Sequence, residues 1–172
     1  MRKFVAITLM AALIFGCKNA EEKKEVASNV TYPYSLEKPD NWDIGSKENT
    51  LLVMNALKAF EDNKVEDCLS YFADTFRWRA DYMDQTLSKD SLRVAMTNLR
   101  NSIQAVQVKM GDFESVISKD KKDEWVTLWY TEIVTDKTGK TDSLAMVNDI
   151  KVANGKIVEL NESIRHFPTK KL

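Results

Sequence analysis

The chain has 172 residues, which is enough for one domain and an extended segment. Its 25 basic and 26 acidic residues give a net charge of −1. Because the basic residues are scattered among the acidic ones, no basic surface for nucleic acid is expected. The single histidine and two cysteines exclude the usual zinc clusters, and the five isolated glycines form no phosphate-binding loop. We therefore expect no metal, no cofactor and no nucleic-acid partner.

The N-terminus reads as a secretion signal. Arg2 and Lys3 precede an apolar run over residues 5–15 that is interrupted only by Thr8. The run is shorter than the roughly 20 residues that a membrane-spanning helix needs, but its length suits the apolar region of a signal peptide. It ends in Ile14-Phe15-Gly16-Cys17, which resembles the lipobox of bacterial lipoproteins. The resemblance implies a signal peptide over 1–16 and a lipid-modified Cys17 that anchors the chain to a membrane. The alternative is a plain secretory signal with an incidental cysteine.

The residues after the cysteine indicate where such a lipoprotein would reside. Lys18 rather than Asp follows Cys17, so the usual cue for retention at the inner membrane is missing. Lipoprotein status therefore predicts the cell envelope, at the outer membrane of a Gram-negative bacterium. The pair Glu21-Glu22 resembles surface-export signals, which leaves both the periplasmic face and the cell surface open. Without residues 1–16 the net charge becomes −3.

Composition divides the remaining chain. Residues 17–43 are polar and predict a flexible tether that carries the lipid, with Trp42 holding its far end to the domain. A single domain is expected over 44–167, followed by a short tail over 168–172. Cys68 is the only other cysteine, so no intramolecular disulfide is expected. It shares an apolar stripe with Val65 and Leu69, which predicts a small buried side chain rather than a reactive thiol.

The hydrophobic period changes once along the domain. Three helices are predicted first, at 46–60, 65–72 and 88–103, with Ser46 as the N-cap of the first. A short strand over 76–80 separates the last two, and residues 81–87 are expected to form a loop. The period then becomes two, which predicts strands at 106–118, 124–135, 142–152 and 156–166. Asn154-Gly155 is a strong signal for a tight hairpin turn. Helices followed by antiparallel strands indicate an α+β fold with the helices on one face of a sheet.

The strand at 124–134 is apolar on both faces. Trp125 and Trp129 point one way, and Leu128 and Tyr130 point the other way. A sheet with one face in water should show a polar row on that face. We therefore expect the second face to be covered, either by packing within the chain or by a second copy in a homodimer.

Two segments at opposite ends of the domain carry a family resemblance. In residues 57–74 one helix leads through Asn63-Lys64 to a second that ends in Phe72-Ala73-Asp74, and residues 155–162 read GKIVELNE. Together they resemble the nuclear transport factor 2-like superfamily, particularly its SnoaL-like branch, although Asn63-Lys64 replaces a frequent Gly-Asp turn. The resemblance covers roughly 46–166. It implies a cone, in which a curved sheet wraps around helices and a pocket opens at the wide end.

The resemblance also allows one mechanism to be tested residue by residue. Ketosteroid isomerases of this fold use a tyrosine, a carboxylate base and a protonated carboxylic acid. Alignment on the two segments places these positions at Ala56, Ala80 and about Asn148. Since alanine cannot transfer a proton, that mechanism is absent.

Other candidates for the site follow from the strand pattern. Glu162 lies among apolar neighbours and is a candidate pocket carboxylate opposite Asn148, although a place in solvent at the sheet edge is an equal alternative. Asp84 and Tyr82 are weaker candidates in the loop expected at the mouth, and His166 is expected at the rim. The residues predicted to line the interior are Phe76, Trp78, Ala80, Trp125, Trp129, Asn148 and Glu162. Such a wall suits an apolar ligand.

Three functions are compatible with this pattern. The first is a noncatalytic module that binds a small apolar ligand or a protein partner in its cone. The second is a SnoaL-like isomerase, lyase or hydrolase that uses Glu162 or Asp84 as a base. The third is a scaffold whose own aromatic side chains fill the cone. Fold alone does not separate them, because this superfamily contains all three kinds.

Overall fold

A computed structural model describes residues 31–37 and 41–167. The chain divides into two compact units, 1–37 and 38–172. Residues 31–37 form no helix or strand, so every element below belongs to the second unit. Cys17, the predicted signal peptide and the tail at 168–172 lie outside the described residues. No helix among those described is both long and apolar enough to cross a membrane.

Three helices precede the long strands, as the period predicted. They are α1 (Lys47–Glu61), α2 (Val65–Leu69) and α3 (Lys89–Ser102). The Ser46 hydroxyl caps α1 by accepting from the amide of Asn49, and Ser88 caps α3 through the amide of Ser91. Each cap satisfies one backbone donor that the first turn of a helix leaves unpaired. The predicted N-cap at Ser46 is confirmed.

Seven strands form one sheet in the order β1-β4-β5-β6-β7-β2-β3. All neighbours are antiparallel except β2 and β7, which run parallel. Asn154 and Gly155 both have positive φ, 51° and 67°, so the predicted hairpin turn between β6 and β7 is confirmed. The strands are β1 (Trp42–Ile44), β2 (Phe72–Ala80), β3 (Met83–Ser88), β4 (Ile103–Ser118), β5 (Glu124–Asp136), β6 (Thr141–Ala153) and β7 (Lys156–His166).

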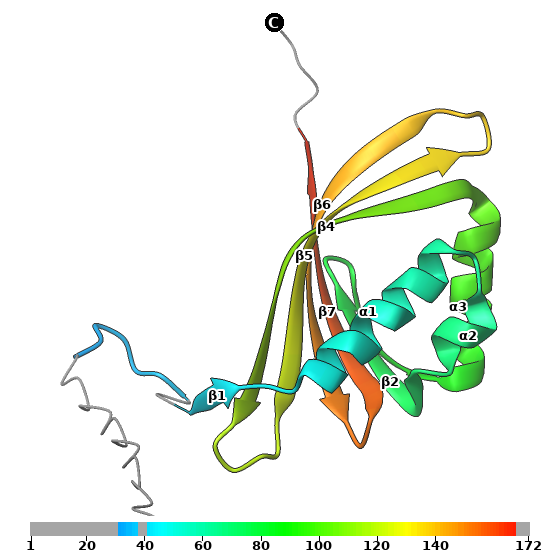
Figure 1. Cartoon of the computed structure of the whole chain (residues 1–172). Coiled ribbons are helices and arrows are strands. Elements are labelled where there is room, and N and C mark those ends of the chain that lie inside the picture. The colour runs from blue at the N-terminus through cyan, green and yellow to red at the C-terminus, as the bar shows by residue number, and fades with distance from the viewer. Residues whose placement is uncertain (1–30, 38–40, 168–172) are drawn as a thin grey trace, which may run out of the picture. The chain divides into compact units, whose positions relative to one another are not determined.

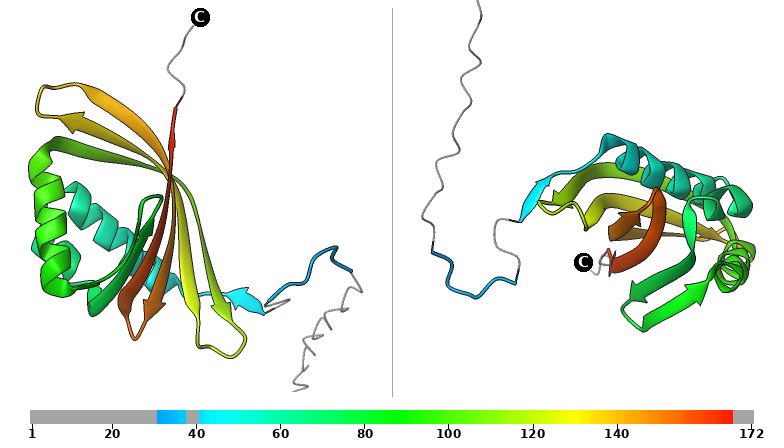
Figure 2. Two further views of the ribbon diagram at one scale, coloured as in Figure 1. Left: turned by 180° about the vertical axis from the view of Figure 1, so that it is seen from behind. Right: turned by 90° about the horizontal axis from the view of Figure 1, so that it is seen from below.

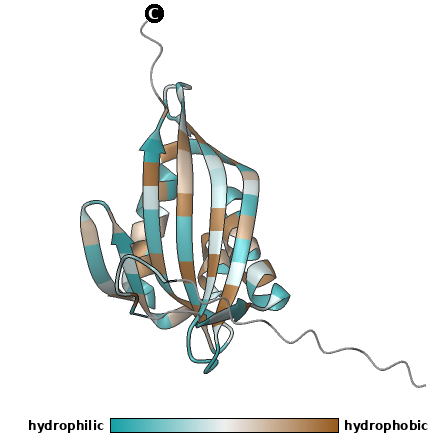
Figure 3. Cartoon of the chain, turned by 90° about the vertical axis from the view of Figure 1, so that its left-hand side faces the viewer, coloured by the Kyte–Doolittle hydropathy of each residue, from teal (hydrophilic) through white to brown (hydrophobic). Residues whose placement is uncertain are grey.

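The sheet of this unit is strongly curved and does not close. Figure 1 shows the three helices on its concave side, and the two views in Figure 2 agree. The α+β fold predicted from the sequence is therefore confirmed. We call the side toward the helices the concave face and the opposite side the convex face; Figure 3 shows the convex face, where hydrophobic and hydrophilic bands alternate along the strands.

The core lies between the helices and the concave face. Each helix contributes its apolar stripe, and β5 contributes every second residue. Phe76, Leu92 and Leu128 are at most 1% exposed, and the rings of Phe72 and Phe76 meet edge to face. Cys68 is a buried free thiol, as predicted. The buried apolar residues of this core cluster are Val53, Ala56, Ala59, Cys68, Leu69, Phe72, Phe76, Leu92, Met96, Val126, Leu128, Tyr130, Met146, Ile150, Val152 and Ile157.

Three local predictions need correction. Residues 42–44, placed in or beside the tether, form β1, which pairs with the end of β4. Phe72, placed on the second helix, begins β2 instead, because α2 ends after one turn at Leu69. Residues 83–87, expected as a loop, form the edge strand β3 together with Ser88. The pattern missed β3 because four of its six residues are exposed, so it shows no buried alternation.

Candidate functional site

Four polar residues meet on the concave face of three neighbouring strands. Tyr130 and Glu132 come from β5, Asn148 from β6 and Glu162 from β7. Asn148 lies directly opposite Glu162, so the two side chains share a face. Tyr130 and Glu132 are two residues apart and share that face as well. We call these four residues the inner polar cluster.

A hydrogen bond joins two members of the cluster. Asn148 Nδ2 donates to the Tyr130 hydroxyl over 3.0 Å. Both residues belong to the interior, since Tyr130 is 5% and Asn148 6% exposed. Glu132 and Glu162 are half-buried. The cluster therefore has a buried amide–phenol end and a carboxylate end that water can reach.

Burial raises the pKa of both carboxylates of the cluster. Burial raises the pKa of Glu162 to about 7, and the charges of Glu132 and Asp81 add to the effect. Burial also raises the pKa of Glu132, although the charge of Arg100 opposes the change. The pKa of Tyr130 is raised chiefly by burial and further by Glu132 and Glu162. Glu162 can therefore gain or lose a proton near neutral pH.

Arg100 supplies a positive charge beside the inner polar cluster, where it acts on Glu132. It lies on the buried stripe of α3 and is 6% exposed. Its Nε donates to Asn63 Oδ1 over 3.2 Å, and its guanidinium carbon lies 5.5 Å from the centroid of the Phe60 ring. The turn residue Asn63, at φ 59°, thus holds Arg100 from the end of α1.

Several buried polar atoms of the interior have no partner among the described residues. They include Asn148 Oδ1, Arg100 Nη1 and Trp78 Nε1. A buried polar atom without a hydrogen bond costs roughly 1–3 kcal/mol, and native structures contain few of them. Asn148 is the most informative, because its amide is fixed by Tyr130 on one side and open on the other.

Phe76, Trp78 and Ala80 of β2 were predicted to line the interior, and the structure agrees with this in part. Phe76 is a core residue, 1% exposed. Trp78, on the same face, is half-buried and packs against the core. Ala80 follows at the end of the strand and is half-buried. Phe76 therefore fills the interior, while Trp78 lies at its edge.

The two tryptophans of β5 do not line the interior, which corrects that prediction. Val126, Leu128 and Tyr130 point into the core, so Trp125 and Trp129 point to the convex face. Trp129 is 37% exposed there. Trp125 lies beneath the ammonium group of Lys151, 5.7 Å from the ring centroid. The sequence could not decide this, because both faces of β5 are apolar.

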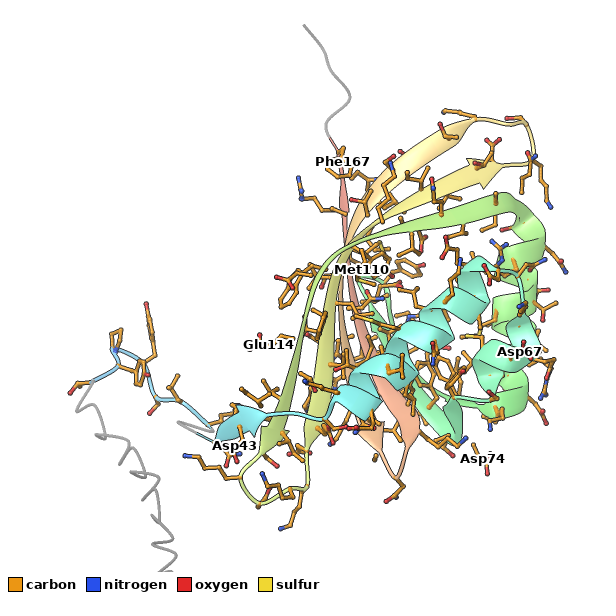
Figure 4. All side chains as sticks on the ribbon, viewed as in Figure 1. Asp43, Asp67, Asp74, Met110, Glu114 and Phe167 are labelled. Atoms are coloured by element: carbon orange, nitrogen blue, oxygen red, sulfur yellow. The ribbon has the colours of Figure 1, made fainter. Side chains whose placement is uncertain are left out.

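Trp129 instead borders a hollow of about 500 Å³ on the convex face. Its walls also include Thr131, Ala145, Val147 and Phe167, which directly follows β7 (Figure 4). A second hollow, of about 470 Å³, lies between α1 and α2 and is lined by polar residues such as Lys58, Asp62 and Asp67. Neither of these two hollows contains a carboxylate of the inner polar cluster.

The other sequence candidates lie outside the cluster. Asp84 is on β3 rather than in a loop and pairs with Arg77, with Nε 2.9 Å from Oδ1. That bond lowers the pKa of Asp84, so its carboxylate is a weaker proton acceptor than that of Glu162, and its place on β3 corrects the predicted loop position. Tyr82 is 87% exposed. His166 has a 74% exposed side chain, with Nδ1 3.9 Å from Asp142, in agreement with a rim position.

Sequence reasoning missed Glu132, Arg100 and Asp81 as part of the site. A signal existed for two of them. Glu132 is two residues beyond Tyr130, so strand alternation puts it on the same face. Arg100 follows Leu92 and Met96 at the four-residue spacing of a buried helix stripe. Asp81 interacts with Glu162 only because the turn between β2 and β3 reaches β7, which is a tertiary contact.

The aligned isomerase positions at Ala56 and Ala80 carry no acid or base. Ala56 is a core residue, 3% exposed, and Ala80 lies at the end of β2; neither has a group that could move a proton. Among the described residues, no group of three histidine, cysteine or acidic side chains could hold a metal ion.

Comparison with known proteins identifies the architecture. No protein-family model and no curated protein sequence matches this chain. Among solved structures, a LEH-like epoxide hydrolase of Mycobacterium tuberculosis is similar with a TM-score of 0.58 and 11% identity over 70% of this chain and 84% of that one. An NTF2-like protein of unknown function from Burkholderia pseudomallei has a TM-score of 0.56 and 18% identity, covering 71% and 92%.

The chain has the nuclear transport factor 2-like fold. A third similar structure, TerC co-crystallised with polyporic acid, has a TM-score of 0.55 and 16% identity over 70% of this chain and 92% of that one. At such identities the likeness extends to the fold alone, so the chemistry depends on the inner polar cluster of this chain.

Proposed function

We propose that the domain binds a small molecule with an apolar body and one polar end. The polar end would lie at the inner polar cluster and the apolar body beside Trp78. The observation that carries this proposal is the unpartnered Oδ1 of the buried Asn148, opposite Glu162. A ligand that hydrogen-bonds this oxygen would remove the cost of leaving it unsatisfied. TerC, co-crystallised with polyporic acid, shows that a similar structure has been obtained with a small organic molecule.

Two tryptophans on opposite faces supply a matched test. N-phenyl-1-naphthylamine, a neutral apolar dye, should bind the full chain and take up energy from tryptophan. Trp78→Leu should weaken binding, whereas Trp129→Leu, on the convex face, should leave it unchanged. The reverse result would move the ligand to the convex hollow. A wild-type chain that binds no such dye would instead favour a scaffold with a filled interior.

A second candidate function, acid–base catalysis, is favoured by one observation. The pKa of Glu162 is raised to about 7, which is the range in which a carboxylate can accept and return a proton at neutral pH. Exchange of the α-protons of 2-indanone in D₂O, followed by NMR, would measure this directly. Catalysed exchange should rise through pH 7 and vanish in Glu162→Gln. Exchange that equals the buffer rate at every pH would exclude this function for that substrate class.

We also propose that Cys17 anchors the domain to the cell envelope, at the outer membrane. The support is the sequence of residues 2–17, a basic start, a short apolar run and a lipobox-like end. Several acyl chains on one cysteine bind a membrane firmly. Cys17→Ala should abolish acyl labelling and release the chain from the membrane fraction. Protease added to intact cells would then distinguish surface display, in which the domain is degraded, from the periplasmic face, in which it is protected.

We also propose that two copies of the chain form a homodimer through the convex face, because apolar side chains are exposed there. Trp129 and Phe167 are 37% and 44% exposed beside the convex hollow. Exposed aromatic groups that border one depression are typical of protein–protein contact surfaces. Trp129→Asp, which would place a charge in this contact, should therefore separate the two copies.

A further inference from the structure

We propose that the polar end of the ligand is a protonated amine, held between Glu162 and Asn148 Oδ1. This inference depends on the proposed binding function and specifies its ligand class. It follows from the signs of the charges around the inner polar cluster and from the kind of hydrogen-bonding atom that is left free there.

The charges around the cluster are predominantly negative. Glu132 from β5, Glu162 from β7 and Asp81 from the turn after β2 interact through their charges. Arg100 from α3 opposes only one of them, Glu132, and its Nε is bonded to Asn63. Once Glu132 and Glu162 are ionised, one cation beside three carboxylates leaves an excess of negative charge, which would attract a cation and repel an anion.

The other charged groups of the surrounding elements do not reverse this balance. On β2, Arg77 and Arg79 point away from the face of Trp78 and pair with Asp84 and Glu159. Lys58 of α1 pairs with Glu61 and Asp62, and Arg93 of α3 pairs with Glu66 and Asp90. Lys151 of β6 pairs with Asp123, and Arg165 of β7 lies over the Phe167 ring. Lys109 of β4 lines the convex hollow. His166 lies near Asp142 at the end of β7.

The hydrogen-bonding atoms left free at Asn148 and Glu162 are acceptors and point to a donor. Asn148 Nδ2 is bound to Tyr130, so its open atom is the acceptor Oδ1. No described residue hydrogen-bonds the carboxylate of Glu162, which is a second acceptor once ionised. An ammonium group carries N–H donors and no acceptor, so it matches both atoms. The same group would leave two unpartnered donors, Trp78 Nε1 and Arg100 Nη1, as they are. Trp78 would contribute through its ring, since the face of an indole attracts a cation.

Three probes of similar shape distinguish the effect of the ligand's charge on affinity from the effect of its apolar body. Benzylamine, benzyl alcohol and benzoate would be titrated by calorimetry into the full chain at about pH 8, above the pKa of Glu162 near 7. Protonated benzylamine should bind at least about tenfold more tightly than benzyl alcohol, a difference of about 1.4 kcal/mol, and benzoate should not bind. Because the bound cation favours the ionised carboxylate, its affinity should rise with pH through 7 and binding should release protons.

Two variants complete the test. Glu162→Gln should remove most of the benzylamine preference and its dependence on pH while leaving benzyl alcohol unchanged. Glu114→Gln is the control, because Glu114 is exposed on the convex face (Figure 4). If benzyl alcohol or benzoate binds as tightly as benzylamine, the amine is wrong but the binding function stands. A preference for benzylamine that survives Glu162→Gln would overturn the role of Glu162, and no binding of any probe would overturn both proposals.

Discussion

Replacing Glu162 with glutamine should stabilise the protein at high pH and leave its stability unchanged in acid. The folded-state pKa of Glu162, about 7, lies above its ordinary value of 4.5. Below pH 4.5 the carboxyl of Glu162 is neutral in both the folded and the unfolded chain, and its contribution to the free energy of unfolding is fully present. This contribution is lost as the pH rises through 7, because Glu162 must then ionise in a half-buried site. The rise from 4.5 to about 7 corresponds to about 3 kcal/mol, since one pKa unit is worth about 1.4 kcal/mol.

Glutamine has nearly the shape of the neutral carboxyl and does not ionise. The gain in the free energy of unfolding of Glu162→Gln over the wild type should thus grow from near zero at about pH 4 to about 3 kcal/mol at about pH 8. Urea unfolding followed by tryptophan emission, repeated across this range, would measure it. Glu114→Gln, an exposed control, should change stability by less than about 0.5 kcal/mol at any pH. A gain that is the same at every pH, or that falls as pH rises, would refute the reasoning about Glu162.

Further predictions concern the core, the thiol and the convex face. Phe76→Ala should cost about 3–5 kcal/mol of unfolding free energy, because Phe76 is 1% exposed. Trp78→Ala should cost clearly less, because Trp78 is half-buried. Equal losses of the two variants in urea unfolding would contradict this prediction. In a Cys17→Ala chain, iodoacetamide at about pH 8 should label Cys68 only after unfolding, since burial raises its pKa to about 12. Trp129→Asp should halve the mass measured by light scattering, and a wild-type monomer at tens of micromolar would end the dimer proposal.

The sequence alone was sufficient for features that depend on neighbours along the chain. The change of period after residue 105 separated three helices from four long strands, because an apolar face recurs every 3.6 residues in one and every two in the other. Asn154-Gly155 determined a turn with positive φ at both residues because few other residues adopt that conformation easily. Counting back from that turn pairs Ala153 with Lys156, and the same count would pair Asn148 with Asn161. A register shift between Lys151 and Val152 adds one residue of β7, so this irregularity of the folded sheet brings Glu162 opposite Asn148, the pair that was predicted.

Features that depend on which surfaces meet required the tertiary structure. Alternation in β5 separates Trp129 from Tyr130, yet with apolar residues on both faces it cannot say which face the helices cover. The edge strand β3 is exposed, so burial left no pattern in its residues. Glu132, Arg100 and Asp81 come from separate elements and share one region only in the folded chain, and their charges change the pKa values there. The pKa of Glu162, and with it the character of the site, is decided by desolvation and by charges distant in sequence, which no local pattern records.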